Sequence, residues 1–80
     1  MLTVRGLLNL LQNLDPDLPV VRHGYEGGYS DATNARTVEL VSDYNDPEEW
    51  WYGPHEDLKY LQQLEQKLDP NRVFKAVLVY

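Results

Sequence analysis

Cysteine is absent from this chain of 80 residues. Its absence excludes a disulfide framework, a thiolate nucleophile and a thiolate zinc site. A chain of this length buries only somewhat over ~60% of its unfolded surface, so the free energy of unfolding is small and has no covalent supplement. We expect a single domain covering residues 1–80, and the lack of cysteine agrees with a reducing cytoplasm.

Long hydrophobic runs are also missing. The longest one covers Ala76–Tyr80, far below the ~20 residues that a bilayer-spanning helix needs. The leucine-rich segment near the N-terminus is interrupted by Asn9, Gln12 and Asn13, and no small-residue cleavage site follows it. We therefore interpret this segment as part of the folded domain and expect no membrane partner.

Basic residues are few, and they are scarcest in the middle of the chain. The net charge is −6, and residues 26–57 hold nine acidic side chains against a single base, Arg36. A field of this sign repels nucleic-acid phosphates and attracts basic protein surfaces. Direct nucleic-acid binding is therefore not expected. The acidic segment is either a recognition surface or a solvated face that keeps the protein soluble.

Two helices are indicated by apolar residues at three- and four-residue steps. The first covers Val4–Leu14, has Thr3 as its N-cap and ends before Pro16, because a residue that precedes proline is pushed out of the helical region. The second covers about His55–Leu68, with a leucine stripe and with acidic side chains near its start.

Three strands are indicated, at Val20–His23, Arg36–Tyr44 and Val73–Tyr80. We expect the first two to pair in antiparallel fashion across a long loop, with Val38 and Leu40 facing the core. The last is apolar on both faces and rich in β-branched residues, which predicts a central position in the sheet. The predicted fold class is α+β: a small three-stranded, mostly antiparallel sheet with two helices, in the order α-β-β-α-β.

A glycine-rich segment, Gly24–Asp31, separates the first two expected strands. Its glycines permit positive φ and close approach of the backbone, which a phosphate-binding loop also needs. The segment has neither the lysine of a P-loop nor the glycine spacing of a dinucleotide-binding loop. We interpret the glycines as a hairpin turn. The sequence leaves open whether Tyr25 and Tyr29 pack back onto the sheet or contact a partner.

Three adjacent aromatic residues, Trp50–Tyr52, follow a second break in the pattern. Neighbouring side chains diverge on a helix or a strand, so all three cannot point into one small core. We expect Trp50 and Tyr52 to fill the core and Trp51 to lie over the sheet edge. Exposed tryptophan and tyrosine are enriched at the centres of binding interfaces, which makes Trp51 a candidate anchor.

Catalytic and metal-binding patterns are weak. His23 and His55 lie near carboxylates in the sequence but without the ordered spacing of a zinc site. The adjacent pairs Glu48–Glu49 and Glu56–Asp57 are expected to be solvated, which does not separate their pKa values as acid–base catalysis requires. No serine lies in a recognisable nucleophile turn. We therefore expect no enzymatic activity, no metal and no cofactor.

Several of these segments carry a resemblance that covers most of the chain. They are a leucine-rich helix, a turn into a strand, a Gly-Tyr-Glu-Gly-Gly-Tyr-x-Asp loop, a Trp-Tyr-Gly-Pro-His-Glu segment and an apolar final strand, here Leu7–Leu14, Asp17–Val21, Gly24–Asp31, Trp51–Glu56 and Ala76–Tyr80. The chain resembles a set of small uncharacterised proteins of bacteriophages and bacterial genomes, from which it departs at Asp57–Arg72. The resemblance implies a phage or prophage accessory role, such as inhibition of host defence by an anti-CRISPR protein.

The function that these observations favour is non-enzymatic binding and inhibition of a host protein with a basic surface, for example a defence nuclease or CRISPR effector in the host cytoplasm. The predicted partner-binding residues are Tyr25, Glu26, Tyr29, Asp31, Asp43, Asp46, Glu48, Glu49 and Trp51. One alternative is a protein that binds a nucleotide signal, with Arg22, Arg36 or His23 countering phosphate charge. Another is a structural or self-assembling phage component. The sequence leaves open whether the protein is a monomer or a homodimer.

Overall fold

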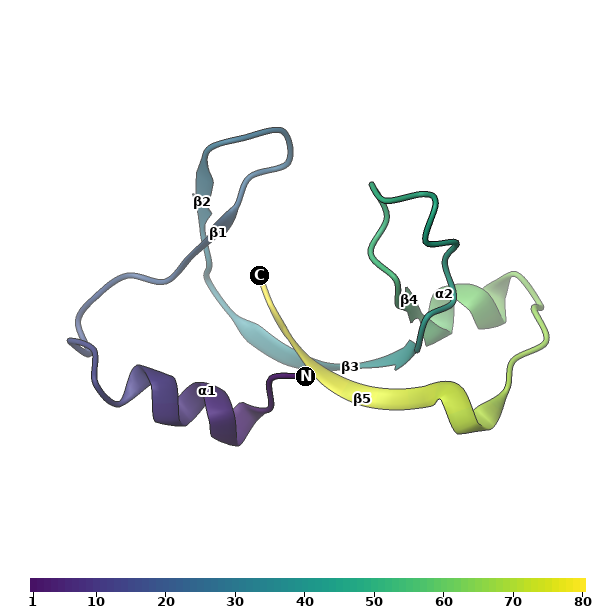
Figure 1. The fold of residues 1–80 in the computed structure, drawn as a ribbon, viewed down its shortest axis with the longest axis horizontal. Coiled ribbons are helices and arrows are strands. Elements are labelled where there is room, and N and C mark those ends of the chain that lie inside the picture. Colours follow the sequence, from purple (N-terminus) through teal and green to yellow (C-terminus); the bar gives the residue numbers. More distant parts are fainter. The chain divides into compact units, whose positions relative to one another are not determined.

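The structure, a computed structural model, describes all residues from Met1 to Tyr80. Its fold class is α+β, as predicted: two α-helices, one short 3-10 helix and five strands that form two small antiparallel sheets (Figure 1). The elements group into two compact units. Unit 1 comprises Met1–Ala35 with Val79–Tyr80, and unit 2 comprises Arg36–Leu78.

Unit 1 begins with helix α1, Val4–Leu11. The predicted N-cap is confirmed, because the Thr3 hydroxyl accepts a hydrogen bond from the Gly6 N–H at 3.1 Å and so satisfies a first-turn donor. The helix ends three residues before the predicted Leu14, in a turn where the Leu14 N–H donates to the Leu11 carbonyl. None of the α1 residues is buried.

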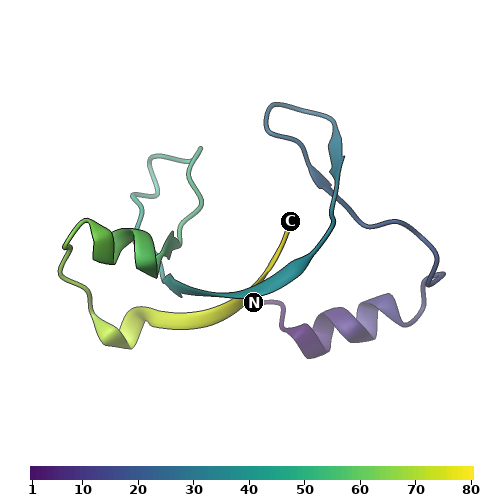
Figure 2. The same cartoon turned by 180° about the vertical axis from the view of Figure 1, so that it is seen from behind.

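A hairpin follows in unit 1, formed by β1 (Val21–His23) and β2 (Tyr29–Asp31) in antiparallel register. Figures 1 and 2 show its two strands and the connecting loop from opposite sides. The Gly24 N–H donates to the Gly28 carbonyl, and Gly28 has a φ of 62°, so the glycines make the turn as predicted. The predicted pairing of the first strand with Arg36–Tyr44 is wrong, because this local turn supplies β1 with a nearer partner.

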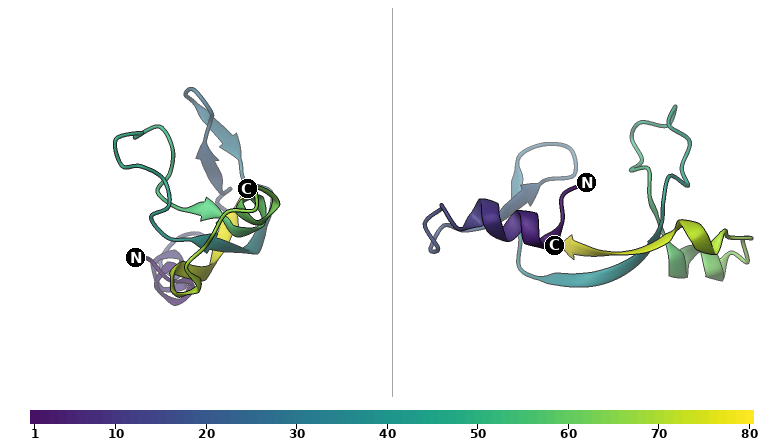
Figure 3. Two further views of the ribbon diagram at one scale, coloured as in Figure 1. Left: turned by 90° about the vertical axis from the view of Figure 1, so that its right-hand side faces the viewer. Right: turned by 60° about the horizontal axis from the view of Figure 1, so that its bottom comes forward.

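The second sheet has the strand order β4-β3-β5, and all of its residues except Ala35 and Val79 belong to unit 2. Its strands are β3 (Ala35–Val41), β4 (Glu56–Asp57) and β5 (Val73–Val79), and β5, which pairs with β3, is seen alongside it in the right-hand view of Figure 3. The predicted central position of the C-terminal strand is wrong: β3 is central and β5 is an edge strand. An unbroken apolar run does not determine which strand pairs on both sides, and the two-residue β4 occupies the other side of β3.

The core of unit 2 is small. Val41 on β3 and Leu61 on α2 (Leu58–Gln63) are the two buried hydrophobic residues, each with 2% of its surface exposed. Val38 and Leu40, which were predicted to face the core, are only half-buried, and the buried residue of this strand is Val41, which was not predicted to face it. Neither α1 nor α2 has the length and apolar composition that a membrane-spanning helix requires.

Helix α2 is shorter at both ends than the predicted His55–Leu68. At its start, Glu56 and Asp57 pair with β3, and the Asp57 carboxylate caps the helix by accepting from the Tyr60 N–H at 2.9 Å. At its end, Glu65 adopts a φ of 56°, and the N–H groups of Glu65 and Gln66 donate to the carbonyls of Gln62 and Leu61. These two bonds are a Schellman motif, which stops the helix.

Candidate functional site

The connection between β3 and β4 carries most of the predicted partner-binding residues. We call residues 42–55 the acidic aromatic loop, because they include four carboxylates and the three adjacent aromatic side chains. The loop is seen in Figure 1 as the excursion that joins β3 to β4. The loop residues predicted to bind a partner are Asp43, Asp46, Glu48, Glu49 and Trp51.

The base of the acidic aromatic loop is closed by hydrogen bonds between its two ends. The Asp43 N–H donates to His55 Nδ1 at 3.1 Å, and Asn45 donates through its N–H to the Pro54 carbonyl and through Nδ2 to the Gly53 carbonyl. The His55 ring also meets the Phe74 ring edge to face at a centroid distance of 5.1 Å. His55 therefore holds the loop to β5.

Arg72 clamps the loop from the end of the short 3-10 helix η1 (Pro70–Arg72). Its Nη2 donates to the backbone carbonyls of Ser42 and Asp43 at 2.5 and 2.6 Å. The Ser42 N–H in turn donates to the Arg72 carbonyl at 2.8 Å. Sequence reasoning missed this residue, since no local pattern relates Arg72 to a loop about thirty positions earlier. The sequence identified Asp43 as a candidate binding residue, but it did not indicate that the Asp43 carbonyl accepts a hydrogen bond from Arg72.

The tip of the loop is built from tight turns. The Asp46 Oδ1 accepts from the Glu48 N–H at 2.9 Å, the Glu49 N–H donates to the Asp46 carbonyl, and the Tyr52 N–H donates to the Glu49 carbonyl. The carboxylate of Asp46, predicted to bind a partner, therefore stabilises the turn by accepting a backbone hydrogen bond. The carboxylates of Glu48 and Glu49 belong to exposed residues.

All three aromatic side chains of the loop are exposed. The exposed fractions are 83% for Trp50, 63% for Trp51 and 57% for Tyr52. The prediction that Trp50 and Tyr52 fill the core is wrong, because the tip turns hold this segment away from the sheet of unit 2. The Trp50 and Trp51 rings meet edge to face at 6.0 Å, and Trp51 lies 6.2 Å from Tyr52. The three rings thus form one apolar surface cluster.

The remaining predicted residues lie in the hairpin of unit 1. Tyr25 is fully exposed at the turn and does not pack back onto the sheet, which was one of the two placements that the sequence left open. Tyr29 on β2 contacts the ring of His23 across the hairpin at a centroid distance of 5.2 Å, although 72% of its surface is exposed. Glu26 and Asp31 are exposed as well. The hairpin therefore presents a second, smaller group of aromatic and acidic side chains.

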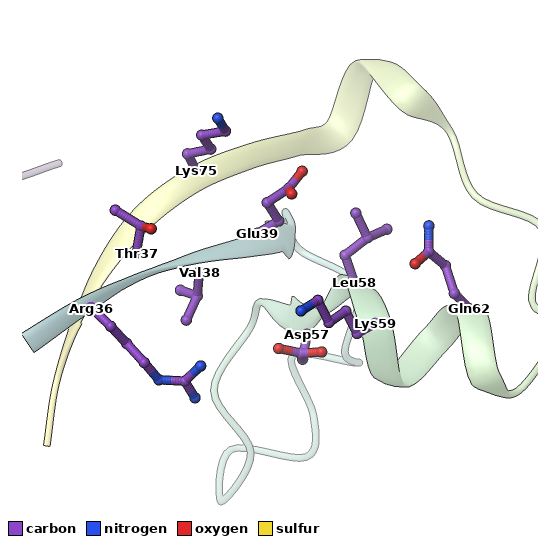
Figure 4. Close-up of a pocket in the computed structure, with 9 residues that line it drawn as sticks. All are labelled: Arg36, Thr37, Val38, Glu39, Asp57, Leu58, Lys59, Gln62 and Lys75. Carbon is purple, nitrogen blue, oxygen red and sulfur yellow. The ribbon is translucent and has the colours of Figure 1, made fainter.

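A shallow pocket of about 460 Å³ lies in unit 2, beside β3 and α2 (Figure 4). Its lining includes three bases and two acids, namely Arg36, Lys59, Lys75, Glu39 and Asp57. In Figure 4, Lys75 and Arg36 point away from opposite sides of the paired strands, and Lys59 lies on the same side as Arg36, beside Asp57. None of the predicted partner-binding residues lines this pocket.

The candidate site consists of exposed aromatic rings and carboxylates, and the backbone of the loop that carries most of them is ordered by hydrogen bonds. The structure brings together no group of three or more His, Asp or Glu side chains that could hold a metal ion. No protein-family model, no curated protein and no solved structure matches the chain. Function is therefore inferred from the acidic aromatic loop and the hairpin themselves.

Proposed function

We propose that this protein is a non-enzymatic phage or prophage accessory protein that binds a basic surface of a host protein and inhibits it. The observation that carries the proposal is the ordered acidic aromatic loop, which holds Trp50 and Trp51 largely exposed on a backbone closed at its base. Exposed tryptophans on an ordered loop are costly to leave in water, and a partner that covers them recovers that cost.

The aromatic side chains are the proposed anchors. Tryptophan and tyrosine bring a large contact area with few rotatable bonds, and they dominate the binding energy of many interfaces. The turns at Asp46 and the clamp by Arg72 order the loop before binding, so less conformational entropy is lost when the complex forms. Trp51, in ring contact with both of its neighbours, is the proposed centre of the cluster.

The carboxylates supply the proposed selectivity for a basic partner. Asp43, Glu48 and Glu49 belong to the same loop as the aromatic cluster, and Glu26 and Asp31 accompany the tyrosines of the hairpin. Charges at the rim of an interface chiefly raise the association rate and disfavour partners of like charge. Affinity is therefore expected to fall as salt is added, with the greater part of the change in the association rate.

The proposed class of partner is a host protein that ordinarily binds nucleic acid, because such proteins carry exposed basic surfaces. The resemblance to phage and prophage proteins makes a defence nuclease or a CRISPR effector in the host cytoplasm the first candidate. An acidic protein seated on that surface would exclude the nucleic acid without any chemical step.

The decisive experiment compares two aromatic substitutions in a pull-down from host lysate, followed by binding measurements on the captured protein. Trp51→Ala is expected to weaken binding by about 30-fold or more, which is about 2 kcal/mol and typical of an interface anchor. Tyr60→Ala is the matched control, since Tyr60 is a half-exposed ring on α2 outside the loop and its loss should leave the affinity unchanged.

Equal affinity of both variants would contradict the proposal that Trp51 is an anchor.

A nucleotide screen by thermal shift tests the alternative hypothesis, in which the glycine turn at Gly24–Gly28 binds a nucleotide. A rise in melting temperature with any nucleotide, abolished by Gly28→Ala, would replace protein inhibition by ligand binding as the function.

A further inference from the structure

A second pocket lies within the acidic aromatic loop itself and has a volume of about 360 Å³. Its lining residues are Asp43, Asn45, Asp46, Pro47, Tyr52 and Pro54. All six belong to unit 2, and none of them is basic. The volume is at the lower end of the roughly 300–1,000 Å³ of small-molecule sites, which suits a single long side chain.

The apolar part of this lining consists of rings. Pro47 and Pro54 contribute their pyrrolidine rings, and Tyr52 contributes an aromatic ring that is 57% exposed. The methylene stem of a long basic side chain packs well against such surfaces while its charged end stays near polar groups. The face of an aromatic ring also attracts a cation, through its quadrupole.

The two carboxylates of the pocket have oxygens to spare. Asp43 is bonded only through its backbone, with its N–H donating to His55 and its carbonyl accepting from Arg72, so its carboxylate has no partner. Asp46 uses one carboxylate oxygen, Oδ1, for the Glu48 N–H, which leaves Oδ2 free. The nearest cation of the chain is thus engaged with backbone carbonyls, and the negative charge of the pocket is not neutralised.

The backbone around the pocket is fixed before any ligand arrives. Asp43 has a φ of 48°, a left-handed conformation that is uncommon outside glycine, and the bonds at its N–H and carbonyl hold it there. Asn45 joins the other end of the loop by donating to the carbonyls of Pro54 and Gly53. Acceptors that are already in place lose little conformational entropy when a ligand binds.

This combination of groups favours a guanidinium over other cations. A metal ion needs several oxygen ligands, and the structure has no group of three or more acidic or histidine side chains to supply them. An ammonium is a compact and strongly hydrated point charge. A guanidinium is planar and more weakly hydrated, stacks on aromatic rings and has five N–H donors for acceptors on different residues.

We propose that this pocket binds an arginine side chain of the partner, with the guanidinium between the carboxylates of Asp43 and Asp46 and against the Tyr52 ring. As a statement about the partner it rests on the proposed function and makes it more specific: the basic surface of the host protein presents an arginine to the loop. Trp50 and Trp51 do not line the pocket, so they remain available for apolar surface beside that arginine. Arginine is itself enriched among the residues that dominate interface energies.

The first test uses a probe small enough to occupy the pocket alone. Acetyl-arginine amide, titrated into the full chain and followed by NMR, is expected to bind with a dissociation constant of about 1 mM and to shift the signals of residues 43–54. Acetyl-citrulline amide has nearly the same shape without the charge and should give no saturable shift. Acetyl-lysine amide should bind about 5-fold more weakly or worse. Absence of binding by the arginine probe, or equal binding of either analogue, overturns the proposal.

The second test removes one negative charge inside the pocket and one outside it. Asp43→Asn preserves the side-chain shape and the tolerance of a left-handed φ, and it should weaken the arginine probe about 10-fold. Glu49→Gln removes the same charge from the same loop away from the pocket and should change the affinity by less than about 2-fold. Amide exchange in residues 42–55 shows whether the loop stays ordered in Asp43→Asn. Tyr52→Leu, which removes only the ring, is the second variant and should also weaken the probe. Equal weakening by the two charge substitutions would mean a diffuse field and no pocket site.

These measurements are separable from the test of the proposed function, because the probe needs no host protein. Binding of the arginine probe that depends on Asp43 supports the pocket even where Trp51→Ala leaves the capture of host proteins unchanged. Capture that is lost in Trp51→Ala but is as strong in Asp43→Asn as in the wild type overturns the arginine pocket and leaves the proposed function in place.

Discussion

The two units of the chain use the same amphipathic pattern in different ways. In unit 2, α2 contributes Leu61 and β3 contributes Val41 to a small core, and each is 2% exposed. In unit 1, α1 has a more regular apolar stripe, yet none of its residues is buried. An apolar periodicity therefore predicts that a helix has a face to cover, but not that an element of the same unit covers it. The difference makes unit 2 the part whose stability is internal.

The largest effect is expected from Leu61→Ala. Removing this buried side chain leaves a cavity in the core of unit 2 and should lower the free energy of unfolding by about 2–5 kcal/mol. Leu64→Ala, one turn along at a half-exposed site, is the control and should cost less than about 1 kcal/mol. Urea denaturation followed by circular dichroism at fixed protein concentration measures both. Similar midpoints for the two variants would mean that unit 2 has no dominant core residue.

The Arg72 clamp should give the next effect. Arg72→Ala removes hydrogen bonds from a charged donor to two backbone carbonyls, at a cost of about 1.5 kcal/mol for this exposed side chain. Arg72→Lys keeps the charge but not the planar guanidinium whose Nη2 makes both bonds, so it should recover only part of the loss. The measurement is amide hydrogen exchange in residues 42–55. Full protection in Arg72→Ala would show that the loop is closed without the clamp.

The two helix caps provide a matched comparison between the units. Thr3→Ala and Asp57→Ala each remove a capping acceptor, worth about 1 kcal/mol. Loss of the Asp57 cap should lower the free energy of unfolding of unit 2, because α2 carries the buried Leu61. Loss of the Thr3 cap should reduce α1 helicity and leave amide exchange in β3 unchanged. Faster exchange in β3 on Thr3→Ala would break the distinction between the units.

The smallest effect is expected from Glu65→Gly, and its sign is opposite. Glu65 occupies the left-handed region at a φ of 56°, where glycine carries no steric cost. The substitution should raise the free energy of unfolding by about 0.5–1 kcal/mol. Gln66→Gly, at the next position of the same motif, is the control and should not stabilise. The thermal midpoint measures both, and a lower midpoint for Glu65→Gly would contradict the strain assigned to this residue.

The sequence predicted the elements that depend on neighbouring residues. The Thr3 cap, the glycine turn and the α+β class all follow from local chemistry, and the structure bears them out. The end of α2 was missed because its left-handed residue is a glutamate, where a glycine would have signalled the stop. The position of β5 was missed because a run of β-branched residues indicates a strand without indicating its neighbours.

The candidate site was predicted in composition and not in geometry. The acids and aromatic residues of the loop are evident in the sequence, but their exposure depends on turns at Asp46 and on bonds from Asn45 and Arg72. The bonds from Arg72 join residues far apart in the chain, and no residue spacing in a single sequence predicts them. Burial of Trp50 and Tyr52 was expected because large aromatic residues usually fill cores, and the tip turns override that tendency.

The clamp also bears on the order in which the chain folds. The paired residues of the β1–β2 hairpin lie at most ten positions apart, so this hairpin closes early. Arg72 must find Ser42 across a separation of thirty residues, and such long closures come later because more chain entropy is lost before any bond forms. The surface proposed to bind a host protein is therefore a late product of folding. A nascent chain that has not reached Arg72 already carries every residue of the acidic aromatic loop, but not the clamp that holds its base.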